Sequence, residues 1–410
     1  MPPVILALNA GSSSLKFALY ELSESLPLLV KGSVASLNAN PRLRLSGGGE
    51  PARQRDLGAG PLDSGSAVEI AADEIRSVVD ISRLQAVGHR IVHGGWAFTS
   101  PAFLDDDVVE ELRRLIPLAP IHQPQNLEIV DRAKSLFPGA AQVGCFDTAF
   151  HAGRPAVARA YGLPRELSES GIQSYGFHGL SYAYISSELR KSYGPPAGGK
   201  VIVAHLGSGA SLCAMLDGKS VATTMGFSPL DGLVMSTRCG ALDPGVVLYL
   251  LQERGMRAEE VARLLYHQSG LLGISGITGD MQRLLQSDSP EARGAVDAFV
   301  YRAGREIGSL AAALGGLDML VFTAGIGENS PAIRELIGAA AKWLGVQVDP
   351  DLNLKGEPSI STPASKVRIL VMPTDEEVEV AREALRLLQG NESGHRGSPL
   401  TANQIYGEGK

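Results

Sequence analysis

The feature that most constrains the fold is a pattern that occurs twice. Near its start the chain reads ILALNAGSSSLKFAL, and roughly half a chain later it reads VIVAHLGSGASLCAML. Each copy is an apolar strand, a bend of Gly and Ser, and a second strand that begins Ser-Leu. A structural pattern repeated at this distance indicates two similar halves. Two unrelated hairpins would give the same letters, because Gly and Ser are common turn residues.

The remaining sequence alternates between strand-like and helical runs. Short apolar runs such as QAVGHRIV and LDMLVFTAG are separated by segments with helical periodicity. In one of these, apolar residues recur at steps of three, four and seven: Val296, Phe299, Val300, Ile307, Ala311 and Leu314. Alternating strands and helices predict an α/β fold, and 410 residues favour two domains over one.

Composition narrows the class of partner and the compartment. The net charge of −7 argues against nucleic acid and against an anionic membrane surface as partners. No apolar run is long enough to span a bilayer, and the first residues lack the pattern of a signal peptide. The cysteines, Cys145, Cys213 and Cys239, are not spaced for a metal site and are expected as free thiols. These features predict a cytoplasmic protein.

Several separated segments carry the chemistry of an anion site. The first Gly/Ser bend would turn backbone N–H groups and hydroxyls towards one point, with Lys16 nearby. GHRIVHGG supplies Arg90, FDTAFH supplies Asp147, and MSTRCGALDP supplies Arg238. In FTAGIGENSP, a glycine-lined turn is expected to lead into a helix capped by Ser330. Taken singly, each segment also has an ordinary structural explanation, such as a surface ion pair or a helix cap.

Together, these segments give the chain a clear resemblance. It resembles the acetate kinases, the acetokinase family of the sugar kinase/Hsp70/actin superfamily. The motifs NAGSSSLKF, VGHRIVHGG, FDTAFH, YGFHG, MGFSPLDGL, SGLLGISG, FTAGIGENS and TDEE occur in the family's order and cover nearly everything but the tail. The resemblance implies two RNase H-like (actin-like ATPase) domains with an active-site cleft between them.

The resemblance also implies domain boundaries. The first domain would comprise residues 1–147 plus 375–392, closed by the C-terminal helix. The second, 148–374, would hold the nucleotide site and the interface of a homodimer. Residues 393–410 would form a flexible tail.

The resemblance further implies a role for each matched residue. Mg²⁺, with Mn²⁺ as the alternative ion, would be held by Asn9 and Glu376. The catalytic residues would be Arg90, His122, Asp147, His178 and Arg238. A small carboxylate would bind at Arg90, Val92, Ile121, Phe177 and Pro229. ATP and its phosphates would contact Ser12, Ser14, Lys16, His205, Gly207, Ser208, Gly209, Asp280, Met281, Gln282, Gly325, Ile326, Gly327, Glu328 and Asn329.

Four departures from the family pattern leave alternatives open. Ser208 stands where an asparagine is expected, Gln282 where an arginine is expected, and Cys239 with Ala241 where a serine and an acid are expected. YGFHGTSH has become YGFHGLSY, which introduces Leu180 and Tyr182. The expected activity is reversible, magnesium-dependent phosphoryl transfer from ATP to acetate. The alternatives are a kinase for propionate or another short acyl group, a kinase with another phosphoryl donor, and a degenerate protein that binds nucleotide or acyl phosphate as a sensor.

Overall fold

The computed structural model describes residues 2–11, 14–47, 50–194 and 199–392. The chain divides into two compact units. Unit 1 combines the residues up to Ala152 with those from Asp375 onward, and unit 2 is Gly153–Thr374. Of the predicted features, Ser12 and the tail 393–410 lie outside the described residues.

Unit 1 is built on an eight-stranded sheet with the order β5-β4-β3-β2-β1-β6-β8-β7. Its strands are β1 (Val4–Gly11), β2 (Ser14–Glu21), β3 (Leu28–Ala35), β4 (Arg42–Gly47), β5 (Glu50–Asp56), β6 (Leu84–Ile91), β7 (Ala102–Phe103) and β8 (Ala141–Phe146). Its helices are α1 (Ser64–Val78), α2 (Asp106–Arg114), α3 (Gln123–Leu136) and α15 (Glu376–Glu392). The strands β1 to β5 pair antiparallel, whereas β1, β6 and β8 run parallel.

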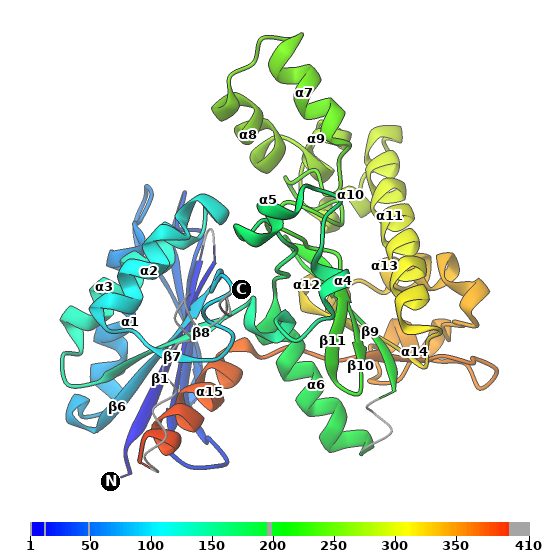
Figure 1. The fold of residues 1–410 in the computed structure, drawn as a ribbon. Helices are drawn as coiled ribbons and strands as arrows, with labels where there is room; N and C mark the ends of the chain where they lie inside the picture. The colour runs from blue at the N-terminus through cyan, green and yellow to red at the C-terminus, as the bar shows by residue number, and fades with distance from the viewer. Residues whose placement is uncertain (1, 12–13, 48–49, 195–198, 393–410) are drawn as a thin grey trace, which may run out of the picture. The chain divides into compact units, whose positions relative to one another are not determined.

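The two faces of this sheet are covered by different helices (Figure 1). Residues that alternate along β1, Val4, Leu6 and Leu8, pack with α1 and α3 in one buried cluster. On β6, Gly88 lies against α15: a Cβ atom there would come within 2.6 Å of Val380. Because successive strand residues point to opposite faces, α15 covers the face opposite α1 and α3. This packing carries the acidic N-terminal turn of α15 to β1.

Unit 2 is built on a five-stranded sheet with the order β11-β10-β9-β12-β13. Its strands are β9 (Lys200–Leu206), β10 (Ala210–Leu216), β11 (Lys219–Thr223), β12 (Met319–Thr323) and β13 (Arg368–Val371). Its helices are α4 (Ala156–Arg159), α5 (Arg165–Glu169), α6 (Gly179–Tyr193), α7 (Pro244–Gln252), α8 (Ala258–His267), α9 (Gly270–Ser275), α10 (Met281–Leu285), α11 (Pro290–Leu314), α12 (Ala324–Asn329), α13 (Pro331–Ala340) and α14 (Pro350–Lys355). Within this unit, α7 and α8 extend away from the sheet (Figure 1).

The repeated sequence pattern forms the same piece of structure twice. The first copy is the β1–β2 hairpin and the second is the β9–β10 hairpin, and both are antiparallel. In each sheet the hairpin is followed by a third antiparallel strand on one side and by two parallel strands on the other, giving β3-β2-β1-β6-β8 and β11-β10-β9-β12-β13. The predicted α/β fold with two similar halves is therefore confirmed, and the alternative of unrelated hairpins is wrong.

Two local predictions need correction. The helix expected from the apolar pattern in 296–314 begins earlier, at Pro290, where Ser289 accepts a hydrogen bond from the backbone of Ala292. Of the apolar residues predicted on its face, Val300 is only half-buried. The glycines of GIGEN lie in a short helix, α12, and not in an open turn. Ser330 caps the next helix, α13, as predicted.

Candidate active site

The centre of the polar cluster in unit 1 is an ion pair between Arg90 and Asp147. Arg90 lies near the end of β6, and Asp147 directly follows β8, the neighbouring parallel strand. Nε of Arg90 is 3.1 Å from each carboxylate oxygen of Asp147, and Nη2 is 2.7 Å from Oδ2. Asp147 is 1% exposed. This fork fixes one edge of the guanidinium and leaves Nη1 directed elsewhere.

Nη1 of Arg90 joins the pair to β1 and α15. It donates to Oδ1 of Asn9 at 3.1 Å and lies 3.5 Å from a carboxylate oxygen of Glu376. The amide nitrogen of Asn9 donates to Glu376 at 2.9 Å and to Glu377 at 2.7 Å. The structure thus brings together Asn9, Arg90, Asp147 and Glu376, which the sequence spreads over almost the whole chain.

A cation that the sequence reasoning missed completes this cluster. Lys31 on β3 contacts Asp375 at 2.9 Å and Glu377 at 3.0 Å. Burial by itself would lower the pKa of Lys31, but the two carboxylates outweigh it and raise that pKa above its ordinary value. The pKa of Arg90 is raised in the same way, because Asp147, Glu376 and Glu377 outweigh the cost of burial. Both side chains therefore stay charged across the physiological range.

The other predicted residues that the structure describes in unit 1 lie on β2, just before α3 and directly after β6. Lys16 is exposed on β2 directly opposite Asn9, so the two side chains share a face of the sheet. Ser14 is half-buried at the start of β2. His122 is the residue before α3, and Ile121 precedes it; both are half-buried. Val92 is buried, and its backbone N–H donates to Asn126.

The polar cluster of unit 2 is formed at the end of its own hairpin. His178 precedes α6 with a left-handed backbone (φ 58°, ψ 25°), which is strained for a residue with a Cβ atom. A Cβ atom on Gly209 would lie 3.4 Å from Nε2 of His178 and 3.0 Å from Nη2 of Arg238. Both side chains therefore approach the same glycine. Arg238 also donates to the carbonyl of Pro229 at 2.6 Å, and Phe177 and Pro229 are both buried.

Behind His178 lies a chain of hydroxyl and imidazole groups. Nδ1 of His178 is 2.8 Å from Oγ of Ser211 on β10, and the same oxygen is 2.5 Å from the hydroxyl of Tyr182. The ring of His178 stacks on that of His205, with centroids 4.1 Å apart. Nδ1 of His205 in turn contacts Ser181 at 2.8 Å.

Three of the segments predicted to bind nucleotide line one hollow of about 690 Å³ in unit 2. From the predicted set, the lining residues are Ser208, Asp280, Met281, Gln282, Gly325, Ile326 and Asn329. Asp280 caps α10 by accepting from the backbone N–H of Gln282 at 2.8 Å. Gly207 and Gly209 belong to the β9–β10 turn, where the N–H of Gly207 donates to the carbonyl of Gly209.

Two predicted residues of the GIGEN segment are engaged within the protein. The carboxylate of Glu328 folds back and accepts from the backbone N–H groups of Ala324 and Thr374 at 2.8 and 3.1 Å. The carbonyls of Gly327 and Glu328 accept from Arg334 at 3.0 and 2.8 Å. Arg334 is fully buried and was missed by the sequence reasoning.

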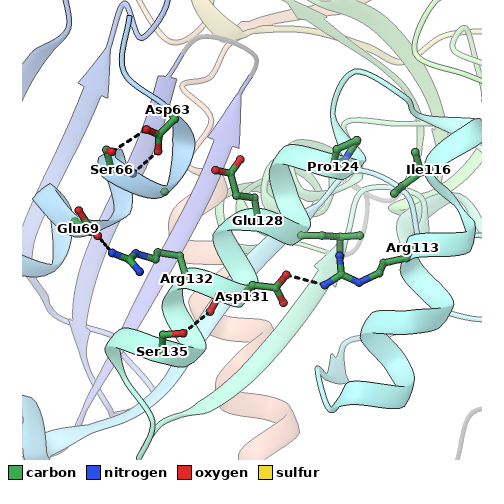
Figure 2. Close-up of a pocket in the computed structure, with 12 residues that line it drawn as sticks. Asp63, Ser66, Glu69, Arg113, Ile116, Pro124, Glu128, Asp131, Arg132 and Ser135 are labelled. Atoms are coloured by element: carbon green, nitrogen blue, oxygen red, sulfur yellow. Dashed lines mark hydrogen bonds and ion pairs between the residues drawn. The ribbon is translucent and has the colours of Figure 1, made fainter.

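A second hollow, of about 610 Å³, lies between α1 and α3 in unit 1 (Figure 2). Its charged groups face one another: Arg132 pairs with Glu69, and Arg113 contacts Asp131 at 2.7 Å. None of the predicted site residues lines this hollow. Its surface ion pairs are accounted for by helix packing.

Two sheets that share five strands in the same order, each with a hairpin that leads to a charged cluster, define a two-domain α/β protein of the actin-like ATPase fold. Arginine, histidine and carboxylate side chains clustered on that fold are typical of a phosphotransferase. Residues 4–382 match the sequence model of the Acetokinase family, and the chain belongs to that family. It is therefore a kinase whose acceptor is a carboxyl group.

Known relatives cover nearly the whole chain. An acetate kinase of Rhodopseudomonas palustris (strain TIE-1) is 50% identical over 95% of this chain and 100% of its own length. The crystal structure of a propionate kinase from Francisella tularensis is 36% identical and covers 93% of this chain and 98% of its own, with a TM-score of 0.85. That of Porphyromonas gingivalis acetate kinase is 34% identical, covers 94% of this chain and 100% of its own, and has a TM-score of 0.80.

Proposed function

We propose that this protein transfers the terminal phosphoryl group of ATP directly and reversibly to acetate, forming acetyl phosphate and ADP. The observation that carries the proposal is the Arg90 cluster. Asp147 holds one edge of the guanidinium, while Nη1 lies beside the amide of Asn9 and the carboxylate of Glu376. The guanidinium charge is fixed next to oxygen atoms that could bind a metal ion, and this arrangement would reduce the repulsion between acetate and the phosphates of ATP.

The reaction brings a carboxylate up to a polyphosphate, so its obstacles are charge repulsion and alignment. A carboxylate needs no general base. The transition state spreads negative charge over the oxygens of a loose, metaphosphate-like group. In our proposal Arg90 and Arg238 meet that charge, and His122 and His178 donate hydrogen bonds to it. Asp147 acts by holding Arg90 in place.

The two clusters would divide the substrates between them. Ser12, Ser14, Lys16 and the turn His205–Gly209 would contact phosphates, and the hollow lined by Asp280 and Gly325 would take the nucleoside. Val92, Ile121, Phe177 and Pro229 would surround the methyl group of acetate. In this proposal, each unit supplies some of the residues.

The residues of unit 1 suit a magnesium ion. Mg²⁺ prefers oxygen ligands and is commonly bound through one or two carboxylates plus substrate phosphates. The amide oxygen of Asn9 and a carboxylate oxygen of Glu376 both lie beside Nη1 of Arg90, at 3.1 and 3.5 Å, and Mn²⁺ has similar preferences. When bound, the ion would neutralise phosphate charge. Arg90 and Lys31 offset part of the negative charge of the carboxylates in this cluster.

The choice of acceptor follows from size. Acetate has four heavy atoms, and small ligands gain at most about 1.5 kcal/mol per atom. Binding should therefore be weak, with Kd on the order of 0.1–10 mM. One extra methylene changes binding by only about 1–3 kcal/mol, so propionate is the second candidate acceptor. The similarity to a propionate kinase of Francisella tularensis supports testing it.

The deciding experiment is an acyl-phosphate assay with hydroxylamine as the trap. Acetate, propionate and butyrate are each combined with ATP, another nucleoside triphosphate and pyrophosphate. We expect the highest kcat/KM for acetate with ATP. A higher kcat/KM with propionate would identify propionate as the preferred acceptor. A higher kcat/KM with pyrophosphate would identify pyrophosphate as the preferred donor. Nucleotide binding by calorimetry without any acyl phosphate would support the sensor instead.

We further propose that the protein forms a homodimer through α7. Within the described residues, no side chain of α7 is buried, although the helix is almost entirely apolar. Val246, Leu248 and Tyr249 are 41%, 52% and 51% exposed. An apolar face of this kind favours a contact with a second copy.

Light scattering after size exclusion tests the dimer. Leu248→Glu should yield monomers, whereas Leu354→Glu on α14, at a site 75% exposed, should leave the mass unchanged. A monomeric unmodified protein would refute the proposal.

The compartment is a further proposal. The described helices include none that is long and apolar enough to cross a bilayer. Cys145 and Cys213 are buried free thiols, which are typical of a reducing compartment. We place the protein in the cytoplasm on this ground.

A further inference from the structure

The imidazole of His178 is held by a hydroxyl group that a second hydroxyl group holds in turn. Oγ of Ser211 lies 2.8 Å from Nδ1 of His178 and 2.5 Å from the hydroxyl of Tyr182. Ser211 and Tyr182 are both 0% exposed. Among the described residues, these are the two partners of the Ser211 hydroxyl.

The number of protons on these three groups restricts the direction of the hydrogen bonds between them. A serine hydroxyl carries one proton and can accept two hydrogen bonds. A phenol is a stronger acid than an aliphatic hydroxyl, so the Tyr182 hydroxyl is the better donor and Ser211 the better acceptor. With Tyr182 donating to Ser211, the single proton of Ser211 is directed to Nδ1 of His178. The neutral ring then carries its own proton on Nε2.

As long as Tyr182 donates to Ser211, the opposite arrangement leaves a buried group unsatisfied. If Nδ1 carried a proton and donated to Ser211, that oxygen would accept from both neighbours. The proton of Ser211 would then have no acceptor in a site closed to water, and an unsatisfied buried donor is costly. This penalty applies equally to the doubly protonated ring.

We propose that Ser211, polarised by Tyr182, is a positioning residue that fixes His178 as the Nε2–H tautomer, so that Nε2 donates a hydrogen bond to the transferring phosphoryl group. The hydrogen bond to the phosphoryl group rests on the proposed function, whereas the assignment of the tautomer does not. Nε2 is the atom that faces Gly209 beside Arg238. Serving as a neutral donor there avoids a second positive charge next to the guanidinium. Tyr182 acts by strengthening the hydrogen bond from Ser211 to Nδ1.

The tautomer can be measured without any assay of activity. Nitrogen-15 NMR of histidine-labelled, full-length protein distinguishes Nε2–H, Nδ1–H and the charged ring, and His178→Gln identifies the resonance. We expect the Nε2–H pattern at neutral pH. Ser211→Ala should introduce the Nδ1–H form, and Ser211→Thr should keep the original pattern. An Nδ1–H or charged ring in the unmodified protein would overturn the proposal.

The link from Tyr182 through Ser211 is tested by kinetics. We expect Ser211→Ala to lower kcat about tenfold and Tyr182→Phe about threefold, with the KM of both substrates nearly unchanged, because a hydrogen bond of about 1.4 kcal/mol corresponds to a factor of ten. The double variant should equal Ser211→Ala alone, since Tyr182 acts only through that hydroxyl. A double variant about thirtyfold slower than the unmodified enzyme would mean independent effects and refute the link.

Two control variants separate positioning from loss of packing. Ser186→Ala, on the same helix as Tyr182, removes a hydroxyl group that donates to the carbonyl of Gly218 at 2.9 Å. Tyr301→Phe removes a hydroxyl group from an exposed tyrosine. Neither should change kcat or the resonance of His178. Urea denaturation of every variant identifies any global loss of stability. If no acyl phosphate forms at all, the proposed function fails, and the NMR result still decides the tautomer.

Discussion

Replacing Arg90 by methionine should separate its catalytic role from its structural role. Nε and Nη2 of Arg90 make three contacts of 2.7–3.1 Å with Asp147, whose side chain is 1% exposed. Removing one partner of such a buried pair typically costs about 3–5 kcal/mol, because the other charge remains buried and uncompensated. Removing one preorganised donor from a dry site typically costs about 3–4 kcal/mol of barrier, or roughly 10²–10³ in kcat.

A second substitution then distinguishes the two costs. In Arg90→Met/Asp147→Asn the buried carboxylate is neutral, so the free energy of unfolding should recover by about half or more of the loss. The kcat should stay roughly 10²–10³ below that of the unmodified enzyme, because the charge that meets the phosphoryl group is still absent. Unfolding is measured with urea, and kcat with the hydroxylamine assay.

Arg113→Met is the matched control. Arg113 also contacts a carboxylate at 2.7 Å, that of Asp131, but both side chains are more than 40% exposed. Its loss should change the free energy of unfolding by less than about 1 kcal/mol and leave kcat unaltered. Recovery of kcat together with stability in the double variant would show that Arg90 is only a scaffold and would refute its catalytic assignment.

Three further predictions follow from single contacts. Burial and the neighbouring Glu379 raise the pKa of Glu383 to about 7, so the folded state loses stability as pH rises from about 4.5 to 7. Glu383→Gln should therefore stabilise the protein by about 3 kcal/mol at pH 8 and far less at pH 4.5; equal gains at both pH values would contradict this. Arg334→Lys should raise the KM for ATP about tenfold with little change in kcat, because lysine cannot hold the GIGEN carbonyls while also binding Asn353 as Nε and Nη2 of Arg334 do; calorimetry showing unchanged nucleotide affinity would exclude it. A Cβ on Gly270 would lie 2.1 Å from the carbonyl oxygen of Met235, whereas one on Gly276, which has a similar φ, meets no atom within 4 Å. Gly270→Ala should thus destabilise the fold by at least about 2 kcal/mol more than Gly276→Ala does in urea, and equal losses would show that backbone conformation alone matters.

The sequence predicted those parts of the fold and of the site that depend on residues close together in the chain. The apolar alternation gave the strands, and the repeated Gly/Ser bend gave the two hairpins. The Arg90–Asp147 contact follows from two motifs at the ends of neighbouring parallel strands. Such residues meet once the strand order is known, but their spacing in the sequence does not contain that order.

The residues that were missed act through tertiary contacts. Glu377 looks like an ordinary acidic residue in the first turn of a helix, and only the packing of α15 against β1 makes it a partner of Asn9 and Lys31. Ser211 is the serine of the repeated Ser-Leu step, but the sequence does not show that its hydroxyl contacts His178 and Tyr182. Arg334 did leave a signal: it falls on the same side of α13 as Ile337, and a charge on an apolar stripe indicates a buried partner.

The two hairpins show how one scaffold can serve two kinds of chemistry. At the end of the first, Asn9 is surrounded by Asp147, Glu376 and Glu377, with Arg90 and Lys31 as counter-charges. At the end of the second, the groups are His178, His205 and Arg238. The carboxylate of Glu328, which is linked to His205 through Thr374 and Ser181, accepts from backbone N–H groups. A cluster rich in carboxylates favours a metal cation, whereas one of imidazole and guanidinium groups favours an anion. Because the hairpins match in position while their polar residues differ, we expect ligand preference to depend on the side chains, and exchanging those side chains should alter it without altering the fold.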